Sequence, residues 1–278
     1  MKKIGFIDYF LDEWHAEKYP GWLSKASNER MEVAYAYGKA NVDGKLSNAE
    51  WSEKKGIQLL HSIEEVVEKS DYLVVLSPDH AIYHEELSWL PLQSGKPTYI
   101  DKTFAPDRAS ALRMIEHADK HRTPMYSTSA LRFAAEYADL EKQGIASICS
   151  LGPGLFENYA IHQVEPIISV MGTDVKRVMW TGTDKTPSLI IGYSDGRQAT
   201  INLYGWECPF TMALHYDAGN SKFLKIESDF FGAFIANMIQ FFDSGQPPVS
   251  HVETIAIATV LEMGMIAAKT PYQWLQLP

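Results

Sequence analysis

The chain has 278 residues, of which 46% are hydrophobic and 22% are charged. At roughly 150 residues per domain this length predicts two domains, and the composition is that of a globular protein with sizeable cores, which excludes a disordered or collagen-like chain. The 35 acidic and 25 basic residues give a formal net charge of -10. Because no local basic stripe offsets this charge, we expect no nucleic-acid partner.

The sequence predicts neither a membrane span nor a secretion signal. No run approaches the ~18 to 20 consecutive apolar residues that a span requires, and Met1-Lys2-Lys3 leads into a short strand-like stretch from Ile4 to Tyr9. We therefore expect a cytoplasmic protein that does not bind a membrane. The two cysteines, Cys149 and Cys208, have no metal-ligand spacing and predict no disulfide, and both are expected to be buried as small hydrophobic residues.

Strand-like and helix-like segments alternate over residues 1–122. This alternation is typical of βαβ units, so we predict an α/β domain with a Rossmann-type, doubly wound parallel sheet. The apolar runs predict strands at residues 3–9, 31–37, 72–76 and 97–100. Helices are predicted at residues 63–68, 85–93 and 108–120. Ser62 and Asp107 are the expected caps of the first and third helices, and Gly95 follows the second as a stop signal.

Residues 123–278 change to short alternating runs separated by Gly, Asp and Asn turns. Strands are predicted at residues 145–149, 176–180, 188–193, 198–204, 211–215 and 223–226. Asp195-Gly196, between two of these runs, is a strong hairpin signal. Helices are predicted at residues 230–242 and 252–268. We therefore predict a second, α+β domain with a mostly antiparallel open sheet.

Four motifs along the chain together point to a family. They are Leu76-Ser77-Pro78-Asp79-His80-Ala81-Ile82-Tyr83-His84, Gly95-Lys96-Pro97-Thr98-Tyr99-Ile100-Asp101-Lys102-Thr103-Phe104-Ala105, Leu131-Arg132-Phe133, and Asn158-Tyr159-Ala160-Ile161-His162-Gln163-Val164-Glu165 ahead of Met171-Gly172. Their order and spacing resemble those of the family of glucose-fructose oxidoreductase and inositol dehydrogenase (Gfo/Idh/MocA). The resemblance implies a dinucleotide-binding domain at 1–122 and a domain for substrate binding and oligomerisation at 123–278, shortened between its first strand and the histidine motif.

The resemblance also implies a bound NAD or NADP, with the choice between them left open. The residues it places at the cofactor are Asp8, Tyr9, Phe10, Tyr37, Ser77, Pro78, His80, His84, Asp101 and Lys102. The first strand departs from the family pattern, because Asp8 and Phe10 stand where the first two glycines of the Gly-x-Gly-x-x-Gly loop are expected. The second strand ends in Tyr37-Gly38-Lys39 and lacks the acidic residue that holds the adenosine ribose. Lys39 either meets a 2′-phosphate or is solvated.

Lys102 and His162 are the candidate proton-transfer residues. Moving a hydride from an alcohol carbon requires a base that takes the hydroxyl proton. Lys102 follows a strand at the carboxyl edge, where open α/β sheets bind ligands; the alternative is a surface lysine paired with Asp101. His162, with an unperturbed pKa of about 6.5, suits a general base near neutrality; the alternative is a structural histidine ahead of a helix. The resemblance implies a catalytic role for both.

Asn158 and Glu165 are the expected supporting residues of the catalytic group. Asn158 stands where the family commonly has aspartate, and its amide hydrogen-bonds a sugar hydroxyl but takes no proton. Glu165 precedes Pro166, which suits the first turn of a helix. Glu165 therefore either orients His162 or a hydroxyl, or it caps that helix.

Four further residues, Tyr83, Arg132, Trp206 and His215, are candidates for the wall of a sugar pocket, although Trp206 is assigned to the core. Two patterns resemble metal-ligand sets. They are His162 with Glu165, and the group of Asp8, Asp12, Glu13 and His15. We expect no metal, because the first set lacks a third ligand and the second is typical of an acidic helix start.

The sequence therefore predicts an oxidoreductase that transfers a hydride between NAD(P) and a sugar, polyol or related hydroxy compound. The alternative is a degenerate, non-catalytic member of the family that binds a small carbohydrate or a protein partner. Lyase or isomerase chemistry with a tightly held cofactor is a third class. We expect a homo-oligomer, a dimer or a tetramer, because an open sheet with an exposed apolar face must be covered.

Overall fold

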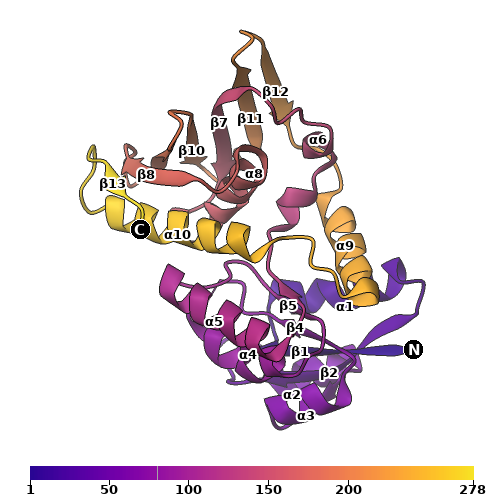
Figure 1. Ribbon diagram of the computed structural model, residues 1–278. Coiled ribbons are helices and arrows are strands. Elements are labelled where there is room, and N and C mark those ends of the chain that lie inside the picture. Colours follow the sequence, from indigo (N-terminus) through magenta and orange to yellow (C-terminus); the bar gives the residue numbers. More distant parts are fainter. Residues whose placement is uncertain (80) are drawn as a thin grey trace. The chain divides into compact units, whose positions relative to one another are not determined.

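The computed structural model describes residues 1–79 and 81–278, and Figure 1 shows their course. The chain forms two compact units. The first unit contains Met1–Thr128 and Gly232–His251, and the second contains Ser129–Phe231 and Val252–Pro278. The chain therefore leaves the first unit, builds most of the second, and returns to the first for one helix.

The first unit is built on a six-stranded parallel sheet, sheet A, with strand order β3-β2-β1-β4-β5-β6. Its strands are β1 (Lys2–Asp8), β2 (Met31–Gly38), β3 (Gln58–Leu59), β4 (Tyr72–Val75), β5 (Thr98–Ile100) and β6 (Met125–Tyr126). This order confirms the predicted doubly wound sheet. The four predicted strands are present, whereas the two edge strands, β3 and β6, have only two residues each and gave no periodic signal.

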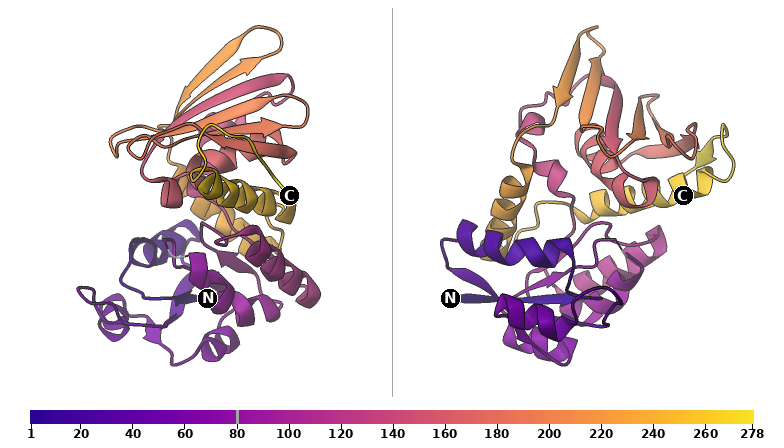
Figure 2. Two further views of the ribbon diagram at one scale, coloured as in Figure 1. Left: turned by 90° about the vertical axis from the view of Figure 1, so that its left-hand side faces the viewer. Right: turned by 180° about the vertical axis from the view of Figure 1, so that it is seen from behind.

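Helices lie on both faces of sheet A, so its central strands are buried on both sides (Figure 2). They are α1 (Trp14–Ala26), α2 (Asn48–Lys55), α3 (Ile63–Lys69), the 3-10 turn η1 (Ala81–Tyr83), α4 (His84–Gln93) and α5 (Arg108–His121). The predicted caps are confirmed: Ser62 accepts from Glu65 N at 3.3 Å, and Asp107 accepts from Ser110 N at 2.7 Å. The sequence analysis placed an acidic helix start at the beginning of α1 but gave no range for that helix, and it did not predict α2.

Helix α9 (Phe230–Ser244) belongs to the first unit from Gly232 onward. Its aromatic side chains pack against rings of sheet A: Phe234 against Tyr99, and Phe242 stacked on Tyr72 with ring centres 4.7 Å apart. These contacts bury one face of the helix and attach it to the first unit.

The second unit is built on a seven-stranded sheet, sheet B, with strand order β12-β11-β7-β10-β9-β8-β13. Its strands are β7 (Ile145–Pro153), β8 (Val175–Trp180), β9 (Ser188–Tyr193), β10 (Gln198–Tyr204), β11 (Thr211–Tyr216), β12 (Ser221–Lys225) and β13 (Leu275–Gln276). All neighbours are antiparallel except β7 and β10, which confirms the predicted, mostly antiparallel sheet. The predicted hairpin is present, with Gly196 at φ +91 between β9 and β10.

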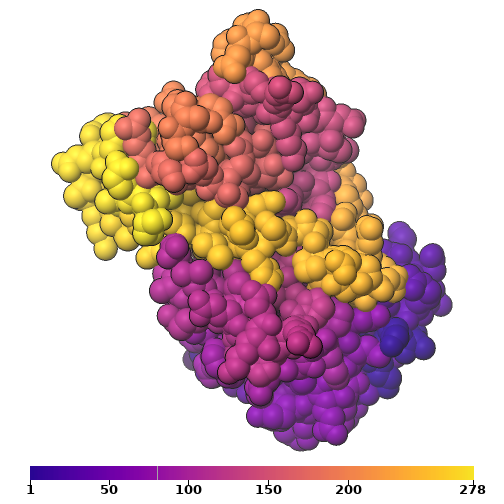
Figure 3. Space-filling view, in the orientation of Figure 1, coloured from indigo at the N-terminus to yellow at the C-terminus, as the bar shows by residue number. Residues whose placement is uncertain are grey.

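Two helices pack against one face of sheet B and form the core of the second unit (Figure 2). They are α8 (Ile161–Met171) and α10 (His251–Ala267), and shorter segments, η2 (Ala130–Phe133), α6 (Ala135–Ala138) and α7 (Phe156–Tyr159), accompany them. Gly264 of α10 permits close packing, because a Cβ there would lie 2.5 Å from Phe156 Cζ. The hairpin of β11 and β12 forms the orange surface at the top of Figure 3.

The prediction that both cysteines are buried is wrong: Cys149 is exposed and Cys208 is half-buried. Successive strand residues point to opposite faces of a sheet, so Ile148 of β7 faces the core and Cys149 faces outward. Throughout residues 1–79 and 81–278, every helix is too short or too polar to cross a bilayer.

Candidate functional site

The carboxyl edge of sheet A brings together residues that follow β1 and β4. Asp8 is the last residue of β1, and its Oδ1 accepts from Ser77 Oγ at 2.8 Å and from Tyr9 N at 2.6 Å. Tyr9 N also lies 3.0 Å from Ser77 Oγ. Parallel strands end at the same edge of a sheet, so residues far apart in the sequence meet there.

Asp8 is a buried carboxyl group with incomplete hydrogen bonding. Its Oδ2 atom is buried and has no hydrogen-bond partner among residues 1–79 and 81–278. Burial is the main reason that the pKa of Asp8 is raised well above its ordinary value, and the nearby carboxylates of Glu13 and Asp101 add to this effect. Asp8 therefore holds a proton at a higher pH than an exposed aspartate.

Lys102 follows β5 and is buried. Its Nζ donates to Pro78 O at 3.2 Å and lies 3.6 Å from Asp79 Oδ1. Asp101 instead accepts from Tyr99 OH at 2.6 Å. The alternative of a surface lysine paired with Asp101 is therefore wrong, because successive residues after the strand point in different directions.

His84, at the start of α4, is fully buried and links two loops of this edge. Its Nδ1 lies 3.0 Å from Phe104 O, and its Nε2 lies 3.1 Å from Ser77 O. Burial lowers the pKa of His84, so the ring is neutral at pH 7 and donates to one of the two carbonyls. Ser77 itself has φ +76, a left-handed conformation that is uncommon outside glycine. The predicted residue His80 lies outside the described residues.

Two tyrosines lie close together beside this edge. The rings of Tyr9 and Tyr83 stack with their centres 4.0 Å apart and an interplanar angle of 8°. Lys39 Nζ is 5.8 Å from the centre of the Tyr83 ring and forms an ion pair with Glu86. Tyr37, half-buried on β2, pairs with Ile7 of β1.

Glu13 forms the N-terminal cap of α1. Its carboxylate accepts from Ala16 N, and from His15 N at 2.7 Å. His15 Nδ1 lies 3.1 Å from Glu13 Oε2, and its Nε2 lies 3.7 Å from Asp101 Oδ2. Burial alone would lower the pKa of His15, but these two carboxylates outweigh burial and raise it.

In the second unit, Ser129 connects His162 and Glu165. Ser129 Oγ lies 2.7 Å from His162 Nδ1, and Ser129 N donates to Glu165 Oε2 at 2.6 Å. Ser129 Oγ also accepts from Leu131 N at 3.1 Å, which caps η2. The sequence analysis missed Ser129; its one available signal was its position immediately before the Leu131-Arg132-Phe133 motif.

Glu165 is held by an ion-pair network within the second unit. Arg132 Nη1 is 3.6 Å from Glu165 Oε1, and Arg132 Nη2 is 2.6 Å from Glu253 Oε2. The expectation that Pro166 lies in the first turn is wrong, because α8 begins at Ile161. Glu165 therefore does not cap the helix; its buried carboxylate binds the segment of Ser129 and Arg132 instead.

Two aromatic rings, those of Tyr159 and Phe210, lie against the ring of His162. The ring of Tyr159 meets those of His162 and Trp206 edge to face, at 5.1 and 4.8 Å, and Phe210 lies 5.8 Å from His162. The assignment of Trp206 to the core is wrong, because 63% of its surface is exposed. Asn158 is half-buried on α7, and its side chain makes no hydrogen bond within the part of the chain that the structure describes.

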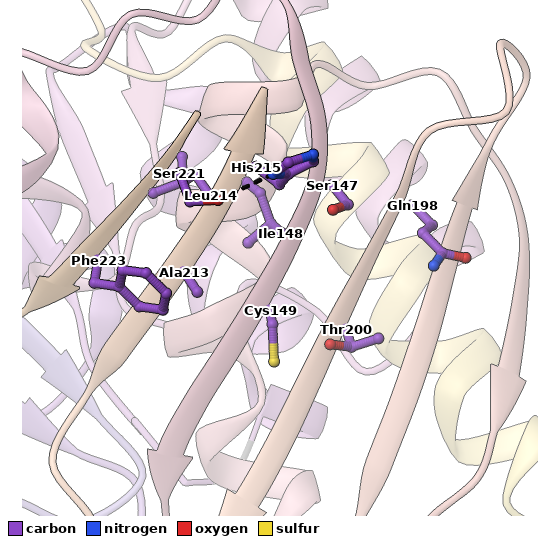
Figure 4. A pocket seen from close by; sticks show the side chains of 10 residues that line it. All are labelled: Ser147, Ile148, Cys149, Gln198, Thr200, Ala213, Leu214, His215, Ser221 and Phe223. Carbon is purple, nitrogen blue, oxygen red and sulfur yellow. Dashed lines mark hydrogen bonds between the residues drawn. The ribbon is translucent and has the colours of Figure 1, made fainter. Parts of the chain in front are cut away.

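A shallow groove lies on the outer face of sheet B (Figure 4). Its lining residues come from four strands: Ser147, Ile148, Cys149, Gln198, Thr200, Ala213, Leu214, His215, Ser221 and Phe223. His215 Nδ1 lies 3.0 Å from Ser221 Oγ. His215 is the one sugar-pocket candidate that lies here, and the predicted catalytic residues do not line this groove.

Neither metal-ligand pattern forms a metal site. Among the described residues, no group of three His, Cys, Asp or Glu side chains is arranged to hold a metal ion. Glu165 is bound to Ser129 and Arg132, and Asp12 Oδ2 accepts from Leu46 N at 2.9 Å. These carboxylates already form hydrogen bonds or an ion pair with other residues of the chain.

Similarity to known proteins is found in structure alone. No protein-family model and no curated protein sequence matches this chain. A probable dehydrogenase from Thermotoga maritima matches with a TM-score of 0.80 and 15% identity, over 99% of this chain and 98% of that one. A putative myo-inositol dehydrogenase from Sinorhizobium meliloti matches with a TM-score of 0.79 and 11% identity, over 100% of both chains.

A third match is the WlbA dehydrogenase from Bordetella pertussis, solved in complex with NADH and UDP-GlcNAcA. Its TM-score is 0.77 at 14% identity, over 100% of this chain and 99% of that one. The three matches extend over 98% or more of each chain. They confirm that this chain has the two-domain fold of the glucose-fructose oxidoreductase and inositol dehydrogenase family.

Proposed function

We propose that this chain binds a sugar, a polyol or a related hydroxy compound, and that His162 meets a hydroxyl group of that ligand. The observation that carries the proposal is the contact of 2.7 Å between Ser129 Oγ and His162 Nδ1, beside the rings of Tyr159, Trp206 and Phe210. Aromatic faces stack on the C-H faces of sugars, and a fixed polar group selects a hydroxyl. The exposed Trp206, which contacts His162 through the ring of Tyr159, supplies the aromatic face, and the oriented His162 supplies the polar group.

Ser129 determines which nitrogen of His162 can act as a base. If Nε2 is to take a hydroxyl proton, the hydrogen of the neutral ring must be on Nδ1. Ser129 Oγ is placed to accept that Nδ1 hydrogen. Glu165, by accepting from Ser129 N at 2.6 Å, holds the serine in position.

Hydride transfer between the hydroxy compound and NAD or NADP is the first candidate activity. The dehydrogenase fold supports it, as does the presence of NADH in the matched WlbA structure. In this activity Lys102 orients the substrate, and the nicotinamide would supply the hydride acceptor. Lys102 is suitably buried at the carboxyl edge of sheet A, but the turn after β1 does not fit a diphosphate, because the Glu13 carboxylate already occupies amides of the first turn of α1.

Binding of the same ligand without redox turnover is the second candidate activity, and the Glu13 contact specifically favours it. Under both candidates, the domain boundaries and roles are those that the resemblance implies: residues 1–122 form the domain of the dinucleotide-binding type, and residues 123–278 form the domain for substrate binding and oligomerisation. The protein is then a homo-oligomer, a dimer or a tetramer, in which a second copy covers the outer face of sheet B.

The test is a titration of the intact protein with free aldoses, alditols and inositols. Binding is measured by calorimetry and by the shift of the thermal unfolding midpoint. We expect saturable binding of at least one compound, weakened about tenfold or more in His162→Ala and in Trp206→Ala. His215→Ala, in the groove on sheet B, is the matched control and should bind like the wild type. The proposal fails if no compound binds or if the His215 variant alone loses binding.

A further inference from the structure

We infer that the turn between β1 and α1 is filled by the chain's own side chains and is closed to the diphosphate of NAD and NADP. This turn is where a dinucleotide fold normally binds the two phosphates of its coenzyme. The inference concerns residues of the first unit only, so it does not depend on the sugar site proposed at His162.

The turn keeps the spacing of the glycine-rich loop but replaces each glycine. Asp8, Phe10 and Glu13 stand at the three positions of Gly-x-Gly-x-x-Gly. The glycines normally permit a tight turn, close approach of the backbone to the diphosphate, and close packing of helix on strand. Here the three positions carry a buried carboxyl group, an aromatic ring and a second carboxylate.

Glu13 takes the place that a phosphate would occupy at the start of α1. A helix N-terminus binds an anion through the free N–H groups of its first turn. In this chain those of His15 and Ala16 already donate to the Glu13 carboxylate. A phosphate would have to displace this carboxylate and then remain beside it, and two anions at such a distance repel each other.

Two further backbone donors of the turn, Tyr9 N and Leu11 N, are also used. Leu11 N donates to Asn48 Oδ1 at 2.9 Å, and Tyr9 N is bonded to Asp8 and Ser77. Asn48 is fixed in turn, because its Nδ2 donates to Gly38 O at 3.1 Å and to Ala40 O at 2.8 Å. This amide lies so close to Gly38 that a Cβ there would come within 2.3 Å of Asn48 Oδ1.

Asn48 therefore occupies the space at the end of β2 in which an acidic side chain would hold the ribose. The nearby rings also contact each other: Tyr9 stacks on Tyr83, and Phe10 lies edge to face with Tyr9 at 6.5 Å. The ring of His15, in the first turn of α1, is already held between Glu13 and Asp101. The first-turn amides of α1, the Leu11 amide and the space beside Gly38 are thus already occupied by groups of the chain.

The first measurement is a titration of the wild-type protein with NADH and with NADPH. Binding is measured by nucleotide fluorescence and by the shift of the thermal unfolding midpoint. We expect no saturation and no shift of the midpoint up to millimolar nucleotide. Saturable binding of either nucleotide would overturn the inference. Binding of the sugar panel by the same preparation is measured separately, so failure of the sugar proposal and failure of this inference give different results.

The second measurement uses the variant Asp8→Gly/Phe10→Gly/Glu13→Gly, which restores the glycine pattern. We expect saturable NADH binding at least about tenfold tighter than the wild-type detection limit. Glu50→Gly, which removes the capping-box carboxylate of α2, is the matched control and should gain nothing. If the triple variant folds cooperatively and still binds no NADH, these three side chains are not what closes the turn; if it does not fold, the wild-type titration decides.

Discussion

Ser129 Oγ contacts His162 Nδ1 at 2.7 Å while it accepts from Leu131 N at 3.1 Å. One hydroxyl thus caps η2 and orients the histidine proposed to meet the ligand. A hydroxyl oxygen can accept two hydrogen bonds. Ser129 Oγ can therefore accept from the Leu131 amide and also from the Nδ1 hydrogen of His162. Ser129 is therefore a positioning residue.

Ser129→Ala should lower the free energy of unfolding by about 1 kcal/mol, because a helix cap is lost. It should also weaken binding of the hydroxy compound about tenfold, since His162 loses the partner that selects its tautomer. Ring nitrogen chemical shifts measured by NMR report the tautomer directly. Ser129→Thr keeps the hydroxyl and should restore both properties; an unchanged tautomer in the alanine variant contradicts the assigned role.

Arg132→Leu should destabilise the protein by about 3 kcal/mol, because it leaves the buried carboxylate of Glu165 without its ion-pair partner. Urea unfolding measures the loss. Arg113→Leu is the matched control, because Arg113 pairs with Glu85 on the surface, and its loss should cost less than about 1 kcal/mol. Equal losses in the two variants would show that the Glu165 network does not stabilise the unit.

Asp8→Asn should stabilise the protein at neutral pH relative to the wild type, and the difference should grow as the pH rises from about 4. The pKa of Asp8 is raised in the folded state by burial. The folded state therefore binds more protons than the unfolded state above pH 4, and the wild type loses stability as the pH rises toward the folded pKa. Chemical unfolding of both proteins at several pH values measures the difference.

Glu136→Gln is a control for which the pH dependence of stability should have the opposite sign. Burial opposes ionisation of Glu136, but hydrogen bonds from the Ser228 hydroxyl and from the Glu227 and Ser228 amides outweigh it and lower its pKa to about 2. Its contribution is present at neutral pH and is lost as the pH falls through that value. The variant should be less stable than the wild type by about 1 kcal/mol at pH 7, after solvent screening, and equal to it near pH 2. The same pH trend in both variants would refute the assignment of Asp8.

Phe223→Asp should reduce the molar mass measured by light scattering, if a second copy covers sheet B as proposed. Phe223 is 80% exposed on β12 and lines the groove of Figure 4. A carboxylate there is costly to bury between two subunits. Ile82→Asp, an exposed apolar position of the first unit, should leave the mass unchanged. A monomeric wild type would remove the basis for this interface.

The sequence by itself determined the architecture, because hydrophobic periodicity and turn residues are local signals. They identified strands β1, β2, β4 and β5 of sheet A and strands β7 to β12 of sheet B. They also identified the Asp195-Gly196 hairpin and the helix caps at Ser62 and Asp107. The motifs also identified Lys102, His162 and Glu165 as residues to examine. The same local signals failed for β3, β6 and β13, because strands of two residues have no measurable period.

Only the tertiary structure decided what those residues contact. Ser129 and His162 are far apart in the sequence and meet because η2 packs beside α8. The charge state of Asp8 depends on burial and on Glu13 and Asp101, and the closing of the turn depends on Asn48, which comes from another helix. Hydrogen bonding, desolvation and repulsion act through space, so no pattern along one segment predicts them.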